Sequence, residues 1–185
     1  MVTINYDVTI EVPNGVTSSI EKNIVFVKGA KGEIKKKFEN PRIEMKINNQ
    51  KFEMKCNSKK TNLNDKMMIN TFAAHFQNML KGVLEGYHAR VKVLSGHFPI
   101  TVSLDGGNTI TVKNFLGEKV PRKVTMMPGV KVVISGDIIN IEGADRDAVA
   151  QSAAKIENLT RITNKDRRIF QDGCYIIEKA GNKKI

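Results

Sequence analysis

Hydrophobic and polar residues alternate along much of the first 56 residues, which is the pattern of strands with one buried face. Turn-forming residues, among them Pro13-Asn14-Gly15 and Asn40-Pro41, separate the alternating runs. The pattern therefore predicts short strands at residues 6–12, 24–28, 33–38, 43–47 and 51–56.

The period of the pattern changes after Asp65. From Ile69 to Val83 the apolar residues recur every three or four positions, as they do on the buried face of a helix. Asn62 or Asn64 can cap the first turn of that helix. We therefore expect one helix to cover the strands of the first half.

The second half repeats this order of elements. Alternating runs predict strands at residues 89–94, 100–104, 109–113, 119–126, 130–134 and 138–142, with a last strand at 174–178. A second helical stripe lies between them and is made of Val149, Ser152, Ala153, Ile156, Leu159 and Thr160.

The two halves are in register. Each position of the second stripe lies 80 residues after an apolar position of the first helix, and Val27–Glu33 matches Val112–Glu118 at Val, Lys, Gly and Glu with an offset of 85. These matches predict an internal duplication. We expect an α+β fold of two tandem domains, residues 1–81 and 82–185, each an antiparallel or mixed β-sheet packed against one main α-helix. A single α+β domain with coincidental similarity is the alternative.

The net charge of the chain indicates what kind of partner it binds. The 185 residues include 30 Lys and Arg against 19 Asp and Glu, a net charge of +11, and both halves share it. Such a charge favours a polyanionic partner. Because aromatic residues make up only 6% of the chain and Trp is absent, binding of single strands by base stacking is disfavoured. Recognition of folded, double-helical RNA by shape and backbone charge fits better.

Several other classes of function are disfavoured. No apolar run is long enough to span a membrane, and the first twelve residues resemble neither a secretory signal nor a transit peptide, so we expect a cytosolic protein. Cys56 and Cys174 form neither a disulfide framework nor a zinc spacing, and we expect both to be reduced core residues. His75, His88 and His97 have no spacing for a metal or a catalytic triad. We expect no cofactor, no metal, no small-molecule substrate and no enzymatic activity.

The segment Gly29-Ala30-Lys31-Gly32 superficially fits the GXXG backbone clamp of KH-type RNA-binding domains. That clamp lies between two helices, whereas this segment lies between two predicted strands. A tight turn is therefore the better interpretation, with Lys28, Lys31 and residues 35–37 around it. The sequence leaves open whether this basic turn is only solvated or adds to an RNA-binding surface.

The segment from Asn164 to Gly173 is the most informative. It places Lys165, Arg167 and Arg168 on a short connector after the second helix. Phe170 follows as an expected anchor, and Gly173 turns the chain into the last strand. Because an arginine can donate two parallel hydrogen bonds to a phosphate, this loop is predicted to contact RNA phosphates.

Three segments also carry a resemblance to a known family: Gly96-His97-Phe98-Pro99-Ile100, residues 114–119 and residues 164–179. In them the chain resembles the large-subunit ribosomal protein six family, in its archaeal and eukaryotic branch. The resemblance covers nearly the whole chain and is looser in the first half. Cys174 departs from the family pattern, which usually has an aliphatic residue there.

The resemblance implies a duplicated pair of α+β domains in the large subunit of the cytosolic ribosome. The second domain would bind large-subunit ribosomal RNA near the sarcin-ricin loop, close to where translation factors dock, with neighbouring ribosomal proteins as further partners and no catalytic role. By motif position the RNA contacts would be Asn114, Lys119, Lys165, Arg167, Arg168 and Lys179. Charge alone extends them to Lys113, Arg122 and Lys123.

Two other classes of function are weighed against this. A free-standing basic adaptor that binds RNA or protein would have the same net charge, so charge alone does not distinguish it. An RNA-modifying enzyme would need a nucleophile or cofactor loop, and no such motif is found in the sequence.

Overall fold

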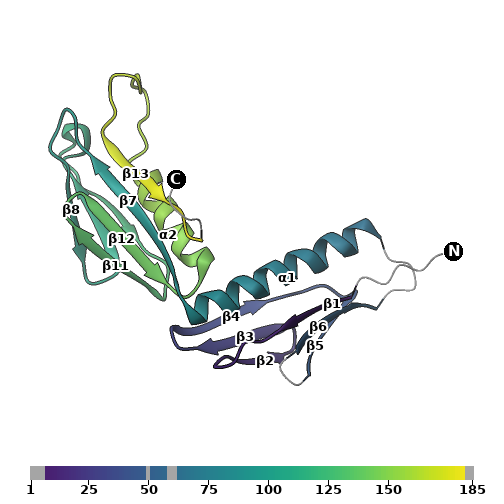
Figure 1. The fold of residues 1–185 in the computed structure, drawn as a ribbon. Helices are drawn as coiled ribbons and strands as arrows, with labels where there is room; N and C mark the ends of the chain where they lie inside the picture. The colour runs from purple at the N-terminus through teal and green to yellow at the C-terminus, as the bar shows by residue number, and fades with distance from the viewer. Residues whose placement is uncertain (1–6, 49–50, 58–61, 182–185) are drawn as a thin grey trace. The chain divides into compact units, whose positions relative to one another are not determined.

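A computed structural model describes residues 7–48, 51–57 and 62–181. The chain divides into two compact units, unit 1 (residues 1–85) and unit 2 (residues 86–185) (Figure 1). The boundary expected between residues 81 and 82 falls inside α1 (Leu63–Leu84), since the helix continues through the buried Gly82.

Unit 1 combines two antiparallel sheets with one helix. The strand orders are β1-β6-β5 and β2-β3-β4, and α1 packs against strands of both sheets. The strands are β1 (Val8–Glu11), β2 (Thr17–Glu21), β3 (Ile24–Gly29), β4 (Gly32–Lys37), β5 (Ile43–Asn48) and β6 (Lys51–Cys56).

Strand β2 was not expected from the pattern. Three of its five residues are exposed and the other two are half-buried, so its sequence, TSSIE, carries little apolar alternation. Tyr6, placed in the first predicted strand, lies outside the described residues.

The predicted stripe of α1 forms the core of unit 1. Ile69, Phe76 and Val83 are almost completely buried, and the ring of Phe76 stacks on that of Phe52 with centroids 4.0 Å apart. Asn62 precedes the helix, and its backbone N–H donates to the Asp65 carboxylate at 3.0 Å. The helix therefore begins at the expected cap.

Residues 29–32 form a tight turn between β3 and β4, as expected. Gly32 has a φ of 144°, and a Cβ added at Gly29 would lie 2.8 Å from the carbonyl oxygen of Val83. The N–H of Lys31 donates to that oxygen at 2.9 Å. The β3–β4 turn thus supplies a hydrogen-bond donor to a free carbonyl at the end of α1. Glycine stands at position 29 because a side chain there would collide with Val83.

Unit 2 has the same plan with one more strand. Its sheets have the orders β11-β12-β7-β13 and β10-β9-β8, all pairs are antiparallel, and α2 packs across β7, β12 and β13. The elements are β7 (Tyr87–Leu94), β8 (Thr101–Asp105), β9 (Thr109–Lys113), the 3₁₀ turn η1 (Phe115–Gly117), β10 (Arg122–Thr125), β11 (Val130–Ser135), β12 (Ile138–Gly143), α2 (Arg146–Leu159) and β13 (Gly173–Glu178).

The two units are copies of one fold. The orders β1-β6-β5 and β2-β3-β4 correspond to β7-β12-β11 and β8-β9-β10, with α1 corresponding to α2. Val149, Ser152, Ala153 and Ile156 are buried on α2, as their counterparts 80 residues earlier are on α1. The expected duplicated α+β fold is confirmed, with two sheets in each unit where one was expected.

The copies differ where strands and helix are connected. Residues 30–31 join β3 to β4, whereas residues 114–121 join β9 to β10, so the strand expected over 119–126 covers only Arg122–Thr125. In unit 2 the chain also continues after the helix, through residues 160–172, into β13. Within the described residues, β13 has no counterpart in unit 1.

Candidate nucleic-acid interface

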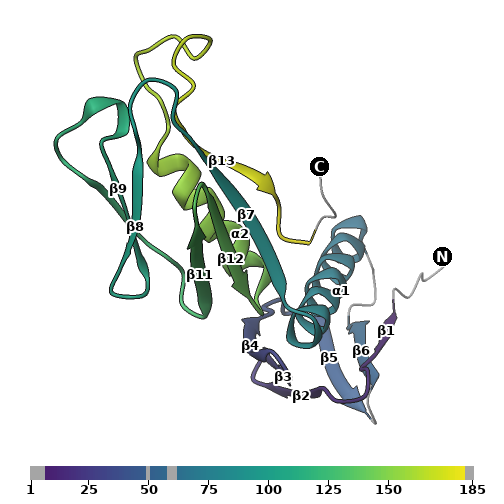
Figure 2. The same cartoon turned by 60° about the vertical axis from the view of Figure 1, so that its left-hand side comes forward.

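Three loops meet at one end of unit 2, and we call this the loop end: residues 95–100, 114–121 and 160–172. They lie at the end of unit 2 where strands β7 and β9 finish and strand β13 begins (Figures 1 and 2). Two of the three are the connections in which unit 2 departs from unit 1, and four sets of contacts hold them together.

The first set centres on Asp172, which is completely buried. Its carboxylate accepts the backbone N–H of Gly96 and that of His97, the latter at 3.0 Å, and the His97 imidazole lies 3.4 Å away. Burial alone would raise the pKa of Asp172, but the two N–H groups and His97 outweigh it and hold this pKa below its usual range. The ionised carboxylate therefore fastens the loop at 160–172 to the loop at 95–100.

The second set joins the loops at 95–100 and 114–121. The side-chain amide of Asn114 donates to the carbonyl of Pro99 at 3.0 Å. Gly117 has a φ of 78°, and a Cβ added there would lie 3.3 Å from the ring of Phe98. Asn114 also has a positive φ, a conformation that asparagine tolerates better than most residues.

The third set is made by Arg122. Its Nε and Nη2 donate to the two carboxylate oxygens of Glu118 at 2.8 and 2.6 Å, and its Nη1 donates to the carbonyl of Leu159 at 2.7 Å. The guanidinium also lies 4.5 Å from the ring centroid of Phe115. The hydrogen bonds from Arg122 lower the pKa of Glu118. Arg122 thus ties the 114–121 loop to the end of α2, with its three guanidinium nitrogens donating to protein oxygens and one face against the ring of Phe115.

The fourth set is aromatic. Phe170 is half-buried, and its ring centroid lies 4.9 Å from that of His97. The ammonium group of Lys165 lies 4.7 Å from the same ring. Phe170 therefore does hold the loop, although it is less buried than a core residue.

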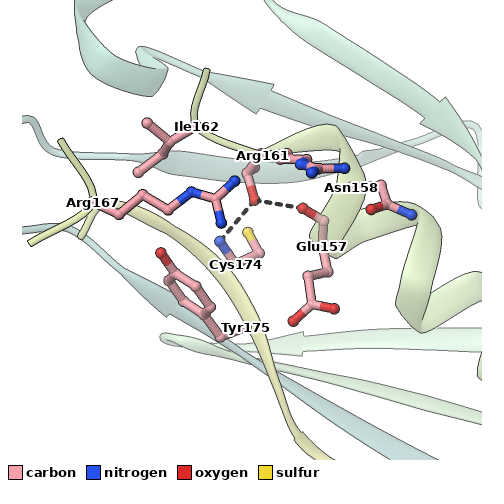
Figure 3. Close-up of a pocket in the computed structure, with 8 residues that line it drawn as sticks. Glu157, Asn158, Arg161, Ile162, Arg167, Cys174 and Tyr175 are labelled. Atoms are coloured by element: carbon pink, nitrogen blue, oxygen red, sulfur yellow. Dashed lines mark hydrogen bonds between the residues drawn. The ribbon is translucent and has the colours of Figure 1, made fainter. Parts of the chain in front are cut away.

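The two arginines of this loop differ in their partners. Arg168 forms an ion pair with Asp166 at 2.9 Å, yet 90% of its side chain is exposed. The hydrogen bond between the two side chains lowers the pKa of Asp166 and raises that of Arg168. The Arg167 side chain has no hydrogen bond or ion pair with the described residues. It reaches instead into an open pocket (Figure 3).

That pocket has a volume of about 260 Å³ and lies between the end of α2, the connector and the start of β13. On its floor the Thr160 hydroxyl accepts the N–H of Cys174 at 2.8 Å, and burial raises the pKa of the Cys174 thiol to about 11. The thiol is therefore protonated near neutral pH and is a poor nucleophile. The lining residues are Glu157, Asn158, Thr160, Arg161, Ile162, Arg167, Cys174 and Tyr175.

Both units of the chain are similar to one known protein family. The family described as Ribosomal protein L6 matches the chain twice, over residues 12–86 and 98–173. The chain belongs to this family. The second match covers the 114–121 and 160–172 loops completely.

Archaeal relatives extend the similarity over nearly the whole chain, and each is named large ribosomal subunit protein uL6. The protein of Ignicoccus hospitalis is 40% identical over 170 residues, which is 90% of this chain and 91% of the relative. That of Methanococcus vannielii is 40% identical over 172 residues, or 93% of both chains. That of Methanosarcina mazei is 38% identical over 172 residues, or 93% of this chain and 96% of the relative.

Most of the other predicted RNA contacts lie at or beside the loop end. Lys113 ends β9, Lys119 follows η1, Lys123 lies near the start of β10, and all three are exposed. Lys179 lies elsewhere, because it follows the opposite end of β13 from Gly173. The loop end thus gathers the predicted cations except Lys179.

Sequence reasoning had not selected Asp172, Arg161 or Tyr175 as site residues. Asp172 and Tyr175 lay within the family motif, but only the fold places Asp172 beside Gly96 and opens Tyr175 to the pocket. Across the described ranges no cluster of His, Cys, Asp or Glu side chains is placed to hold a metal ion, and no helix is both long and apolar enough to cross a membrane.

Proposed function

We propose that this protein is a structural component of the large ribosomal subunit and that its loop end binds large-subunit ribosomal RNA. Membership of the Ribosomal protein L6 family and the names of the archaeal relatives support this role. The observation that carries it is the fastening of three loops by Asp172, Asn114 and Arg122, which fixes the backbone that bears Lys119 and the cations of residues 161–168 before any partner arrives.

Phosphates would be contacted by the exposed cations of the loop end. Fixed loops reduce the conformational entropy lost on binding, and each neutralised phosphate releases counterions. The proposed contacts are Lys113, Asn114, Lys119, Lys123, Lys165, Arg167 and Arg168. Arg122 would act mainly by positioning the 114–121 loop, and Lys179 would make a separate contact.

The finer assignment is a position near the sarcin-ricin loop, close to the docking site of translation factors, in cytosolic ribosomes. Unit 1 would face neighbouring ribosomal proteins or further RNA. The protein would support translation by holding RNA in place, without a cofactor and without catalysing a reaction.

Sedimentation tests the proposal. An epitope-tagged copy, produced in cells of its source, should co-sediment with large subunits on sucrose gradients at low salt. A wash in concentrated salt should release part of it, because salt weakens phosphate contacts. A tagged protein that stays at the top of the low-salt gradient would instead be a free-standing adaptor.

Footprinting tests the finer assignment separately. Large subunits with and without the protein are treated with a reagent that modifies exposed nucleotides. Protection is expected in and beside the sarcin-ricin loop. Protection confined to other RNA helices would overturn the position while leaving the ribosomal role intact.

A further inference from the structure

We propose that the pocket of Figure 3 takes up one unstacked nucleotide of the bound RNA. Its phosphate would lie at Arg161 and Arg167, and its base would lie against Tyr175. This inference rests on the proposed function and goes further, because it assigns a single-nucleotide site that the exposed cations alone do not require.

The two arginines are the first observation. Arg161 and Arg167 line the pocket from different sides, and neither side chain has a hydrogen bond or ion pair with the described residues (Figure 3). Arg122 and Arg168, by contrast, are both paired with carboxylates. Two unpaired guanidinium groups at one pocket are suited to a phosphate, which each can meet with two parallel hydrogen bonds.

The aromatic wall is the second observation. Tyr175 is 38% exposed although it lies in strand β13, and its ring borders the pocket (Figure 3). An exposed ring beside phosphate-binding groups is a platform for base stacking. The low aromatic content of the chain disfavours binding a long single strand, but one base needs only one ring.

The remaining polar groups fit the edge of a base. Glu157 accepts the N–H of Ile176 with Oε1 at 3.2 Å, so one carboxylate oxygen is used by the protein. Glu157 and Asn158 both line the pocket, and their side chains can offer an acceptor and an amide group to the edge of a base. With two arginines and one glutamate the lining carries one net positive charge, which matches the single negative charge of a nucleotide within an RNA chain.

The pocket also lies where RNA would arrive. Its lining includes Arg161, Ile162 and Arg167 from the 160–172 loop, and Asp172 holds that loop to the rest of the loop end. An unpaired nucleotide is the usual target of sequence-dependent RNA recognition.

The test uses the full chain and protein-free ribosomal RNA from large subunits, at one fixed salt concentration. Arg161→Ala should weaken binding about tenfold, because it removes charge-assisted hydrogen bonds. Tyr175→Leu should weaken it at least fivefold, since stacking is lost. Tyr175→Phe keeps the ring and should bind within about twofold of wild type. Lys131→Ala, which removes an exposed cation from β11, is the matched control.

Melting curves on each variant show whether a loss is only structural. An independent measurement needs no substitution: ultraviolet irradiation of the wild-type complex should attach a nucleotide to the peptide that contains Tyr175. Crosslinks that all lie outside residues 157–175 would overturn the proposal.

The outcomes separate this site from the wider function. If only Arg161→Ala weakens binding, the pocket holds a backbone phosphate without a base, and the single-nucleotide site is refuted. If both variants bind like wild type, the pocket is unused while the proposed function stands. If wild-type protein does not bind the RNA at all, the proposed function itself fails.

Discussion

Asp172 is the residue on which the geometry of the loop end depends most directly. It is completely buried, carries charge, and has the N–H groups of Gly96 and His97 as partners. A buried carboxylate is stable only where donors replace the lost water, and here the donors belong to another loop. The residue therefore converts two separate loops into one surface.

Replacing Asp172 with Asn should lower the stability of unit 2 by about 2 kcal/mol or more, because an amide accepts weaker hydrogen bonds than a carboxylate. Urea unfolding at pH 7 measures the change. Asp137→Asn, at an exposed turn, is the control and should stay within about 0.5 kcal/mol of wild type. Equal stability of both variants would show that the Asp172 contacts add nothing to the fold.

The same pair of proteins should show a defined pH dependence. The pKa of Asp172 is lower in the folded chain than in the unfolded chain, where it is about 3.9. Its contribution is therefore fully present above that value and is lost as the pH falls through the folded pKa. The stability difference between wild type and Asp172→Asn should shrink as the pH falls below about 4, where His97 is already protonated and only the carboxylate still titrates. A difference that stays the same or grows as the pH falls from about 4 to 2 would contradict the assignment.

At the scale of elements, the 114–121 loop is the main departure of one copy from the other. Where unit 1 has a two-residue turn that closes α1, unit 2 has a longer loop fastened to α2 by Arg122. The same physical need, a donor for the free carbonyls at a helix end, is met by a backbone N–H in one unit and by a side chain in the other.

Arg122→Lys separates positioning from direct contact. A lysine keeps the charge but cannot bond Glu118 and Leu159 together, so we expect a loss of about 1 kcal/mol in stability and an RNA affinity close to that of Arg122→Ala. Thermal melts and RNA-binding isotherms measure both. Rescue of binding by lysine would mean that Arg122 contacts phosphate through its charge.

The loop at 160–172 should behave in the opposite way. Replacing Arg167 and Arg168 together with Ala should weaken RNA binding at least tenfold and leave the melting temperature almost unchanged, because both side chains are exposed. The control is the double variant Lys46→Ala and Lys131→Ala, which removes two exposed cations from strands β5 and β11. If the double arginine variant bound RNA as tightly as wild type, the loop would only connect α2 to β13 and would not contact RNA.

The elements that the sequence predicts well are those whose burial follows a period. Ile69 and Val149 could be assigned to helix stripes because one face of each helix is buried along its length. Strand β2 was missed for lack of alternation, yet it begins 84 residues before β8 and could have been found from the repeat. Strand pairing was not predictable, because it depends on contacts between residues distant in sequence.

The site was predictable only in part, for the same reason. The cations of residues 165–168 stand out in the sequence because they are adjacent. The engagement of Arg122 with Leu159 joins residues 37 apart, and the contact of Asp172 with Gly96 joins residues 76 apart. The pocket forms only when α2 and β13 pack together, so no local sequence pattern predicts it.

At the scale of the whole molecule, the chain holds two cores. The core of unit 2 runs from Ala89 on β7 to Ala180 after β13, and it includes buried residues of both sheets and of α2. Unit 1 has its own core around α1. This organisation suggests that each unit carries the interactions needed for its own fold.

A fragment of residues 86–185 should therefore unfold cooperatively by itself. It buries a core of its own, although a domain of about 100 residues buries a smaller fraction of its surface than a larger one. Circular dichroism during heating measures the transition. A fragment that shows no cooperative transition would mean that the two units fold as one domain.

The position of β13 in the chain also sets a time order. Every other described element of unit 2 is synthesised before β13, and domains form progressively as the chain lengthens. Until residues 172–178 have been synthesised, the cations of residues 161–168 are connected to the folded unit only through α2, because the contacts of Asp172 and the pairing of β13 with β7 cannot yet form. In a nascent chain these cations would therefore lie on a flexible segment, and the ordered RNA-binding surface would form only when β13 pairs with β7.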